Sequence, residues 1–229
     1  FIKDNQIQQK FKVMEEVQYK VIKRFGPSVF KIKIPNEIVE KLNSYVDKVI
    51  EDKEKQKKLD FGNNLVGDVT QEFFLEPETV RETGWLNFLS KCVQRWVEIE
   101  TGKKIKKFHL EQSWIVRQFQ NEYNPTHWHS GHISGAGFLK VPSSLGSHTQ
   151  KLKSKNMSYR GGQLQLIHGS KMFLSPSTIN IEPKVGEMYF FPNYMMHCVF
   201  PFKNSNEERR SISFNATVDD DIYNVYGQK

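Results

Sequence analysis

The sequence predicts a mainly β, α+β domain in which a closed or sandwiched β-structure follows a helical first half. Two observations carry this prediction. Apolar residues of the first half recur at the three- and four-residue spacing of amphipathic helices, whereas those of the second half alternate with polar residues. About seven short alternating segments, separated by turn residues, are typical of β-sandwiches and barrels. We therefore expect helices to support one β-rich core.

The composition restricts the class of protein. The chain has 229 residues, 38% hydrophobic and 26% charged, with a formal net charge of +7, which fits a globular protein with a lysine-rich surface. No window approaches the length of apolar run that spans a membrane, and the first residues lack the apolar region of a secretory signal. The two cysteines, Cys92 and Cys198, exclude a disulfide framework, so we expect a reducing, cytoplasmic location.

The first half is expected to hold short strands followed by helices. Alternation on both sides of the turn at Gly26-Pro27 predicts a β-hairpin or two short strands, and a polar stretch predicts a loop between two amphipathic helices. Gly102 is expected to end the second helix, because glycine readily adopts the left-handed conformation of a helix C-terminus. The ranges are Val17–Val21 and Val29–Ile34 for strands, Asn36–Ile50 and Glu78–Glu100 for helices, and Lys53–Asn64 for the loop.

The second half is expected to be the barrel. We divide the single domain into strands and supporting helices at 1–110, a β core at 111–218 and a C-terminal tail at 219–229. The polar stretch from Ser143 to Arg160 is too long for a tight hairpin, and long loops of this kind often serve function. The predicted strands are Ser113–Phe119, Ser134–Val141, Gln163–His168, Ser177–Ile181, Glu187–Phe191, His197–Phe200 and Arg209–Thr217.

Three histidines lie within six residues, which composition alone does not explain. In an extended segment, His127 and His129 point to the same side, so both imidazoles can bind one metal ion. His197 follows an apolar strand at a distance that suits a neighbouring barrel strand. His132 could compete with His129 as a ligand, although its spacing fits a loop better. By themselves the histidines are equally compatible with ordinary hydrogen-bonded residues.

The last predicted strand carries a candidate anion clamp. Arg209, Ser211 and Ser213 share one face of this strand, whereas Arg210 shares the other face with Ile212. A guanidinium inside a barrel needs an anionic partner, and its planar fork suits a carboxylate. Arg209 is the expected clamp if polar residues face the ligand. Arg210 is the alternative, because a slip of one residue reverses the faces.

These features resemble the Fe(II)/2-oxoglutarate-dependent oxygenases, most closely the prolyl-hydroxylase-like branch of bacteria and phages. The family pattern is a His-x-Asp/Glu pair, a distal histidine and an Arg-x-Ser pair on the following strand. The resemblance covers about residues 113–218 in order. Its segments are Ser113-Trp114, Tyr123-Asn124-Pro125, His127-x-His129, Ser134-Gly135, Gly162-x-Leu164, Pro183-x-x-Gly186, Phe191-Pro192, His197-x-Val199-x-Pro201 and Arg209-x-Ser211-x-Ser213-Phe214-Asn215.

The resemblance implies a double-stranded β-helix and a hydroxylase. It implies that His127, His129 and His197 are the catalytic iron ligands, that Fe(II), O2 and 2-oxoglutarate are used, and that Arg209 and Ser211 bind the cosubstrate. The expected reaction is hydroxylation of an unactivated C–H bond, with the side chain of a protein or peptide, such as proline, as a candidate substrate. The expected location is the cytoplasm of a bacterium or of a phage-infected cell.

Two positions depart from the family pattern. His129 stands where the usual set has a carboxylate, which also resembles the three-histidine dioxygenases of cupin type that need no 2-oxoglutarate. Phe138 stands where some relatives place a cosubstrate-binding tyrosine, and we suggest Gln118 as a substitute. A non-catalytic metal-binding β-barrel is a further alternative.

We do not expect a nucleic acid partner. Demethylases of this superfamily carry a second arginine six residues after the first, and Asn215 occupies that position. No membrane partner is expected either. The sequence does not specify the primary substrate or the oligomeric state.

Overall fold

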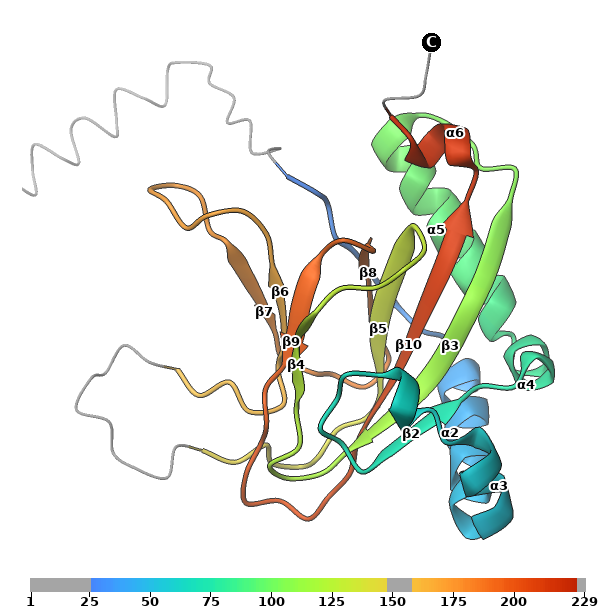
Figure 1. The fold of residues 1–229 in the computed structure, drawn as a ribbon, viewed down its shortest axis with the longest axis vertical. Coiled ribbons are helices and arrows are strands. Elements are labelled where there is room, and N and C mark those ends of the chain that lie inside the picture. The colour runs from blue at the N-terminus through green and yellow to red at the C-terminus, as the bar shows by residue number, and fades with distance from the viewer. Residues whose placement is uncertain (1–25, 148–157, 226–229) are drawn as a thin grey trace, which may run out of the picture.

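A computed structural model describes residues 26–147 and 158–225, and its centre is a pair of antiparallel sheets (Figure 1). The larger sheet has the strand order β1-β8-β5-β10-β3-β2, and the smaller sheet has the order β4-β9-β6-β7. This arrangement confirms the predicted double-stranded β-helix. The strands are β1 Phe30–Lys33, β2 Gln71–Phe74, β3 Phe108–Gln118, β4 Asn124–His127, β5 Ile133–Lys140, β6 Leu164–Ile167, β7 Thr178–Ile181, β8 Glu187–Pro192, β9 Met196–Val199 and β10 Arg209–Val218.

Each strand predicted in the second half has a counterpart in the structure, and β1 confirms the alternation before Pro35. Two strands of the barrel region were missed. The four residues of β2 are short, and β4 contains Pro125 and a register irregularity that hides its alternation. The strand predicted at Val17–Val21 lies outside the described residues.

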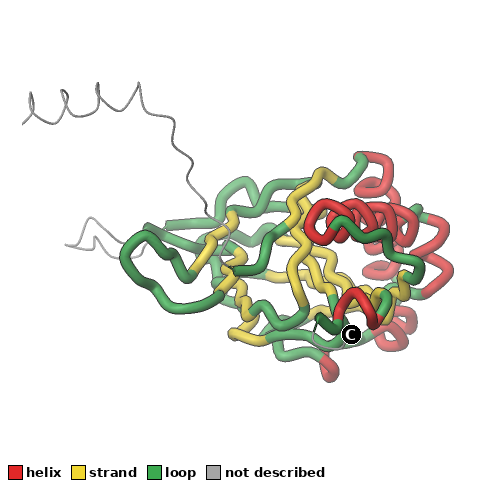
Figure 2. The backbone as a smooth tube through the Cα atoms, turned by 90° about the horizontal axis from the view of Figure 1, so that it is seen from above, coloured by secondary structure: helices red, strands yellow, loops and turns green. Residues whose placement is uncertain are grey.

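The helices cover the outer face of the larger sheet (Figures 1 and 2). Their apolar residues share one core with the outward-facing residues of that sheet, whereas a second, smaller core lies between the sheets. Alternation along β8 places Phe190 in the first core and Phe191 in the second. On β10 the same alternation turns Ile212 toward the helices. The opposite face of β10 is thereby free to line the interior of the barrel.

Two of the expected helix boundaries were wrong. The polar stretch from Lys53 onward is helical, because the Asp52 carboxylate accepts the N–H groups of Glu54 and Lys55 and caps a new helix. The helix expected over Glu78–Glu100 is divided at Gly84, whose φ of +83° is left-handed. The helices are α2 Asn36–Glu51, α3 Lys53–Leu59, η1 Gly62–Asn64, α4 Pro77–Glu82, α5 Trp85–Thr101 and α6 Asp220–Tyr223.

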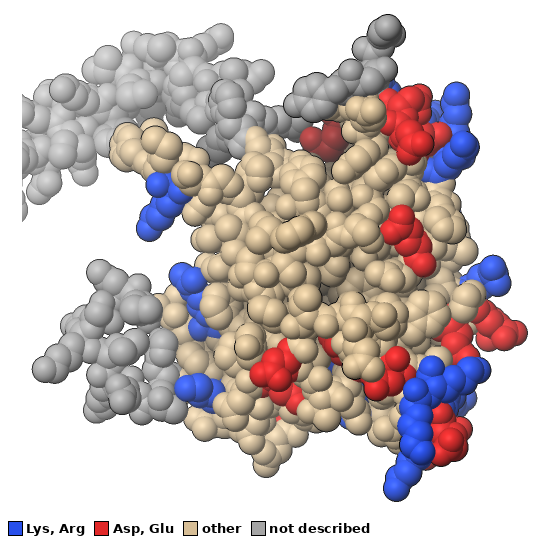
Figure 3. Space-filling model, viewed as in Figure 1, with Lys and Arg blue, Asp and Glu red and all other residues tan. Residues whose placement is uncertain are grey.

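Basic and acidic side chains are interspersed on the face seen in Figure 3. The densest group lies near α3, where Lys57 pairs with Glu54 and Lys58 pairs with Glu76. This mixture fits a solvated surface better than a polyanion-binding patch. None of the helices in the described ranges combines the length and the apolar character needed to cross a bilayer.

Candidate metal centre and its cavity

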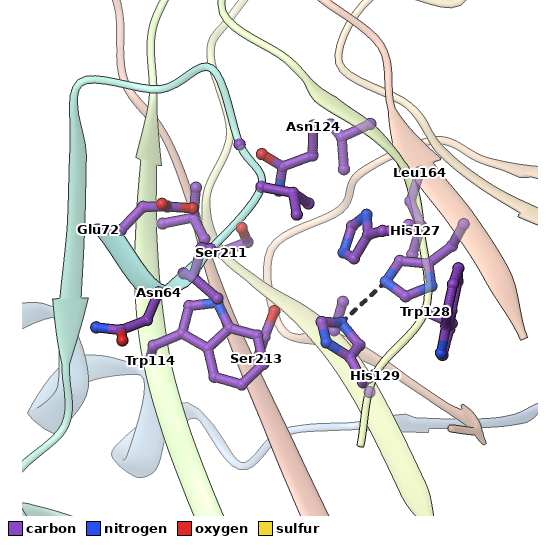
Figure 4. Close-up of a pocket in the computed structure, with 18 of the residues that line it drawn as sticks. Asn64, Glu72, Trp114, Asn124, His127, Trp128, His129, Leu164, Ser211 and Ser213 are labelled. Carbon is purple, nitrogen blue, oxygen red and sulfur yellow. Dashed lines mark hydrogen bonds between the residues drawn. The ribbon is translucent and has the colours of Figure 1, made fainter. Parts of the chain in front are cut away.

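Three histidine side chains from β4, β9 and the residues just after β4 meet in one place; Figure 4 shows His127 and His129 side by side. His127 ends β4 and lies opposite His197 of β9 in the antiparallel register. His129 follows two residues later, where its backbone N–H donates to the carbonyl of Asn193. One ring nitrogen from each histidine lies within 4.8 Å of the others. The structure therefore brings together the three predicted ligands.

Backbone carbonyls orient two of the rings. The Nδ1 of His127 lies 2.7 Å from the carbonyl oxygen of Pro125, and the Nδ1 of His197 lies 2.8 Å from that of Met195. Because a carbonyl only accepts, each Nδ1 must carry the hydrogen, which leaves the Nε2 lone pair free to bind a metal ion. Such fixed orientation by an outer hydrogen bond is the usual support of a metal-binding histidine.

The three imidazoles are held neutral. Burial lowers the pKa of His129 to about 3, with a further contribution from His197 and His127, and burial lowers the pKa of His197 to about 4. Burial also lowers the pKa of His127, against the effect of the Pro125 carbonyl. Neutral imidazole is the form that coordinates metals, so the site needs no deprotonation at neutral pH.

The donor set fits a divalent transition metal. The Nε2 atoms of His129 and His197 lie 3.1 Å apart. Two imidazole nitrogens that bind one ion at about 2.1 Å each, at a right angle, are about 3 Å apart. Imidazole suits iron and zinc, and three ligands on one side leave positions open for a cosubstrate. Among the described residues, no carboxylate or cysteine joins this group.

Arg209 lines the same cavity as the histidines. Its side chain is only 2% exposed, its Nε donates to the carbonyl of Gly162 at 3.0 Å, and its Nη1 lies 3.4 Å from the hydroxyl oxygen of Ser211. The Phe138 ring lies under the guanidinium, with the Arg209 Cζ 5.1 Å from the ring centroid. No carboxylate within the described ranges forms an ion pair with Arg209. Although burial lowers its pKa to about 10, Arg209 stays charged at neutral pH and lacks an anionic partner.

Arg210 points to the other side of the sheet. Its guanidinium contacts Glu208 at 2.6 Å and Asp47 of α2 at 2.7 Å, so its charge is already paired. The alternation of β10 thus places Arg209 at the cavity and gives Arg210 a structural contact between strand and helix.

Gln118 pairs directly with Arg209 in the register of β3 and β10, although it is not among the residues that line the cavity. There its amide Nε2 donates to the backbone carbonyls of Glu122 at 2.6 Å and Phe200 at 3.3 Å. The amide nitrogen therefore closes a loop, and the suggested contact of Gln118 with the cosubstrate stays a prediction.

The remaining candidates separate clearly in space. His132 stacks on Tyr223, with ring centroids 3.9 Å apart, and its Nδ1 accepts the Val218 N–H, so it lies apart from the triad. Cys198 has its Sγ 3.9 Å from the amide oxygen of Gln165, on the face of β9 away from His197. Trp128 is 65% exposed and lines the open side of the cavity.

Sequence reasoning missed the opposite wall of the cavity, which β2 and the segment before it build (Figure 4). The cavity holds about 130 Å³. On this wall lie Glu72 and Asn124, together with Leu65, Val66 and Gly67. Glu72 follows the polar residues Thr70 and Gln71, and β2 has only four residues without alternation, so the sequence offered no signal for this position.

Comparison with known proteins agrees with this geometry. The family described as "Putative 2OG-Fe(II) oxygenase", where 2OG is 2-oxoglutarate, matches residues 112–215. That segment contains all three histidines and Arg209. Over these residues the chain is similar to the 2OG-Fe(II) oxygenases. The match agrees with the expected enzyme class, a 2-oxoglutarate-dependent Fe(II) oxygenase.

Solved structures share the fold of this oxygenase at low sequence identity. A Pseudomonas putida prolyl-4-hydroxylase has a TM-score of 0.53 at 14% identity, covering 82% of this chain and 92% of its own. The viral collagen prolyl hydroxylase of Paramecium bursaria Chlorella virus-1, in its 2OG complex, has a TM-score of 0.51 at 15% identity, covering 82% and 94%. A Trichoplax adhaerens prolyl hydroxylase bound to a hypoxia inducible factor peptide has a TM-score of 0.51 at 12% identity, covering 97% and 96%. No curated protein matches the oxygenase in sequence.

Proposed function

We propose that this oxygenase is a hydroxylase that binds Fe(II) through His127, His129 and His197 and inserts oxygen at an unactivated C–H bond of a protein or peptide side chain, with proline as a candidate. The observation that carries the proposal is the buried, anion-free guanidinium of Arg209 in the cavity of the histidine triad. A small dicarboxylate that reaches both groups satisfies each of them.

Arg209 and Ser211 would hold the distal carboxylate of 2-oxoglutarate. Their side chains already lie side by side, and Phe138 fixes the plane of the guanidinium from below. The Gly162 carbonyl accepts from Nε, so the guanidinium is oriented before the ligand arrives. A charge-assisted hydrogen bond from a fixed fork is stronger and more selective than one from a mobile lysine.

The apolar wall of the cavity excludes water from the reacting atoms. Leu164, Phe191 and Val199 line it between the triad and Arg209. With iron and dioxygen bound, the oxidation of 2-oxoglutarate to succinate and carbon dioxide would supply the oxidising power for C–H hydroxylation. The protein would hold three ligands on one side of the metal ion and orient the dicarboxylate. It would keep the opposite side of the metal ion open for a substrate.

A binding and turnover experiment tests the proposal. The protein is titrated with 2-oxoglutarate in the presence of Fe(II) without oxygen, and succinate is then measured after oxygen is admitted, with proline-containing peptides screened for an added oxygen atom by mass spectrometry. Wild type is expected to bind and turn over 2-oxoglutarate. The Arg209→Gln variant should bind it about 10- to 100-fold more weakly, since a charged hydrogen bond is lost. The exposed Lys57→Gln variant controls for net charge.

A protein that neither binds nor consumes 2-oxoglutarate would contradict the proposal. Oxygen consumption that is indifferent to Arg209→Gln would instead favour a three-histidine dioxygenase that works without this cosubstrate.

A further inference from the structure

Two buried polar side chains, Glu72 and Asn124, line the cavity of the histidine triad, and Glu72 lies on the side away from the histidines (Figure 4). Glu72 is 2% exposed, and neither of its carboxylate oxygens has a hydrogen-bond partner among the described residues. The side-chain oxygen of Asn124 is buried without a partner in the same way. Three acceptor atoms of these two side chains thus have no hydrogen-bond donor among the described residues. Buried polar groups are nearly always satisfied, so this cluster requires an explanation.

The surroundings of Glu72 are negative. Burial, together with a smaller effect of the neighbouring carboxylates of Asp60 and Glu122, raises its pKa to about 7. Asp60 and Glu122 are occupied by backbone donors, Asp60 by the N–H of Gly62 and Glu122 by those of Thr70 and Phe119, so they add charge without neutralising Glu72. A positively charged donor is the ligand that this environment favours most.

Gly67 lies directly over the two acceptor groups. A Cβ at this position would come within 2.2 Å of the Asn124 side-chain oxygen and 3.1 Å of a Glu72 oxygen. The segment Gly62–Asp68 therefore covers the carboxylate closely, and a glycine is required for that approach. Glu72 lines the same cavity as the triad, so a ligand group reaches it through that cavity.

We infer that Glu72 and Asn124 form the specificity subsite of the oxygenase and bind a cationic nitrogen of the substrate, an ammonium or guanidinium group such as the side chain of a lysine or arginine residue. Such a group carries several donors and matches several acceptors, whereas a single amide N–H would leave most of them unpaired. The indole of Trp114 lines the same cavity and adds a surface that attracts cations. The overall charge of +7 gives no long-range attraction, so selectivity rests on this local cluster.

This inference rests on the proposed function, because it assigns the substrate of the same cavity. A substrate anchored at Glu72 extends along the cavity toward His127 and His129, and its neighbouring C–H bonds are presented to the metal side. The predicted substrate class is therefore a peptide or amino acid with a basic side chain at or next to the hydroxylated residue.

A matched set of probes tests the inference by binding, without catalysis. N-acetyl methylamides of lysine, arginine and norleucine are titrated into the Zn(II)- and 2-oxoglutarate-loaded protein and followed by ligand-observed NMR and calorimetry. Norleucine has an unbranched apolar side chain and lacks the cationic nitrogen. We expect the lysine or arginine probe to bind at least 10-fold more tightly than the norleucine probe.

Three variants sharpen the test. Glu72→Gln keeps the shape and removes the charge, and it should abolish the preference for basic probes while the affinity for 2-oxoglutarate stays unchanged. Gly67→Ala fills the space next to the side-chain oxygens of Asn124 and Glu72 and should also weaken the binding of basic probes. It provides an independent test if Glu72→Gln disturbs folding. Glu78→Gln removes the same charge from an exposed position on α4 and should leave the preference intact.

The inference is overturned if the basic probes bind wild type no more tightly than the norleucine probe does. It is also overturned if they bind Glu72→Gln as tightly as wild type. In that case Glu72 is a buried neutral carboxyl with a structural role. If 2-oxoglutarate itself does not bind, the proposed function fails instead, so the two failures are distinguishable.

Discussion

The Nε2 atoms of His129 and His197 lie 3.1 Å apart, although the residues are separated by 68 positions in the chain. The contact exists because β4 and β9 pair in antiparallel register, which sets His127 opposite His197 and places His129 just beyond the strand. The Nδ1 of His197 donates to the Met195 carbonyl, so without a metal ion the Nε2 of His129 must donate the hydrogen of this contact. A metal ion would replace that hydrogen and bind both nitrogens, so this pair is the geometric basis of the candidate metal centre.

We expect His197→Ala to lose most of its metal. Removing one of three ligands leaves two, and the cavity end around them is apolar, so affinity for Fe(II) or Zn(II) should fall by about 100-fold or more, beyond the 10- to 100-fold typical of lost supporting contacts. Metal content after equilibrium dialysis measures the effect. His132→Ala is the matched control, because His132 packs against Tyr223 away from the triad. Equal metal content in both variants would contradict the assignment.

Replacement of His129 by aspartate is expected to preserve metal binding. The variant His129→Asp restores the two-histidine, one-carboxylate set that suits non-haem iron, and the shorter side chain starts from the same backbone position. Fe(II) affinity should stay within about 10-fold of wild type, whereas His129→Ala should lose it. Calorimetric titration with Fe(II) under anaerobic conditions distinguishes the two. A site that needs three imidazoles would show equal losses in both variants.

The two adjacent arginines should give opposite phenotypes. Arg210 is fully buried and ion-paired, so Arg210→Gln should destabilise the fold by about 3 kcal/mol, as expected when a buried charge network loses one member. Arg209→Gln should cost less stability but remove most of the 2-oxoglutarate affinity. Urea unfolding and cosubstrate titration of both variants measure the contrast. Loss of 2-oxoglutarate affinity in a folded Arg210→Gln protein would reverse the assignment of the two side chains.

Glu72 should make the stability of the metal-free protein fall as pH rises. Its pKa is about 7 in the folded protein against an ordinary value of 4.5, so between these pH values the folded state keeps a proton that the unfolded state has released. Stability is therefore lost as pH rises through this window. Glu72→Gln should be more stable than wild type by about 1–3 kcal/mol at pH ~8, after screening near the cavity is allowed for, and nearly equal at pH ~4.

Urea denaturation at both pH values checks this prediction, with the exposed Glu78→Gln as the control for charge. A stabilisation that does not depend on pH would show that Glu72 is ionised throughout or paired with another group.

The spacing of residues in the sequence was sufficient to predict features that lie within a single strand or helix. The alternation of Arg209, Ser211 and Ser213 predicted which arginine faces the interior, and the His127-x-His129 spacing predicted that both rings share a side. It failed where short-range capping competes, as at Asp52 and Gly84. Gln118 shows a further limit, because alternation gives the face of a strand but not the backbone carbonyls that a side-chain amide contacts.

The sequence by itself determined the class of fold, the residues of the triad and the arginine at the cavity, because each follows from a repeat of two or four residues and from the chemistry of a few side chains. Only the tertiary structure decided that Glu72, Asn124 and Gly67 face the triad. These residues come from β2, from β4 and from the segment that precedes β2, and no local repeat relates them. The pairing of β2 with β3 and the bridge between Asp68 and Tyr123 bring them together. Burial leaves Glu72 without a hydrogen-bond partner among the described residues.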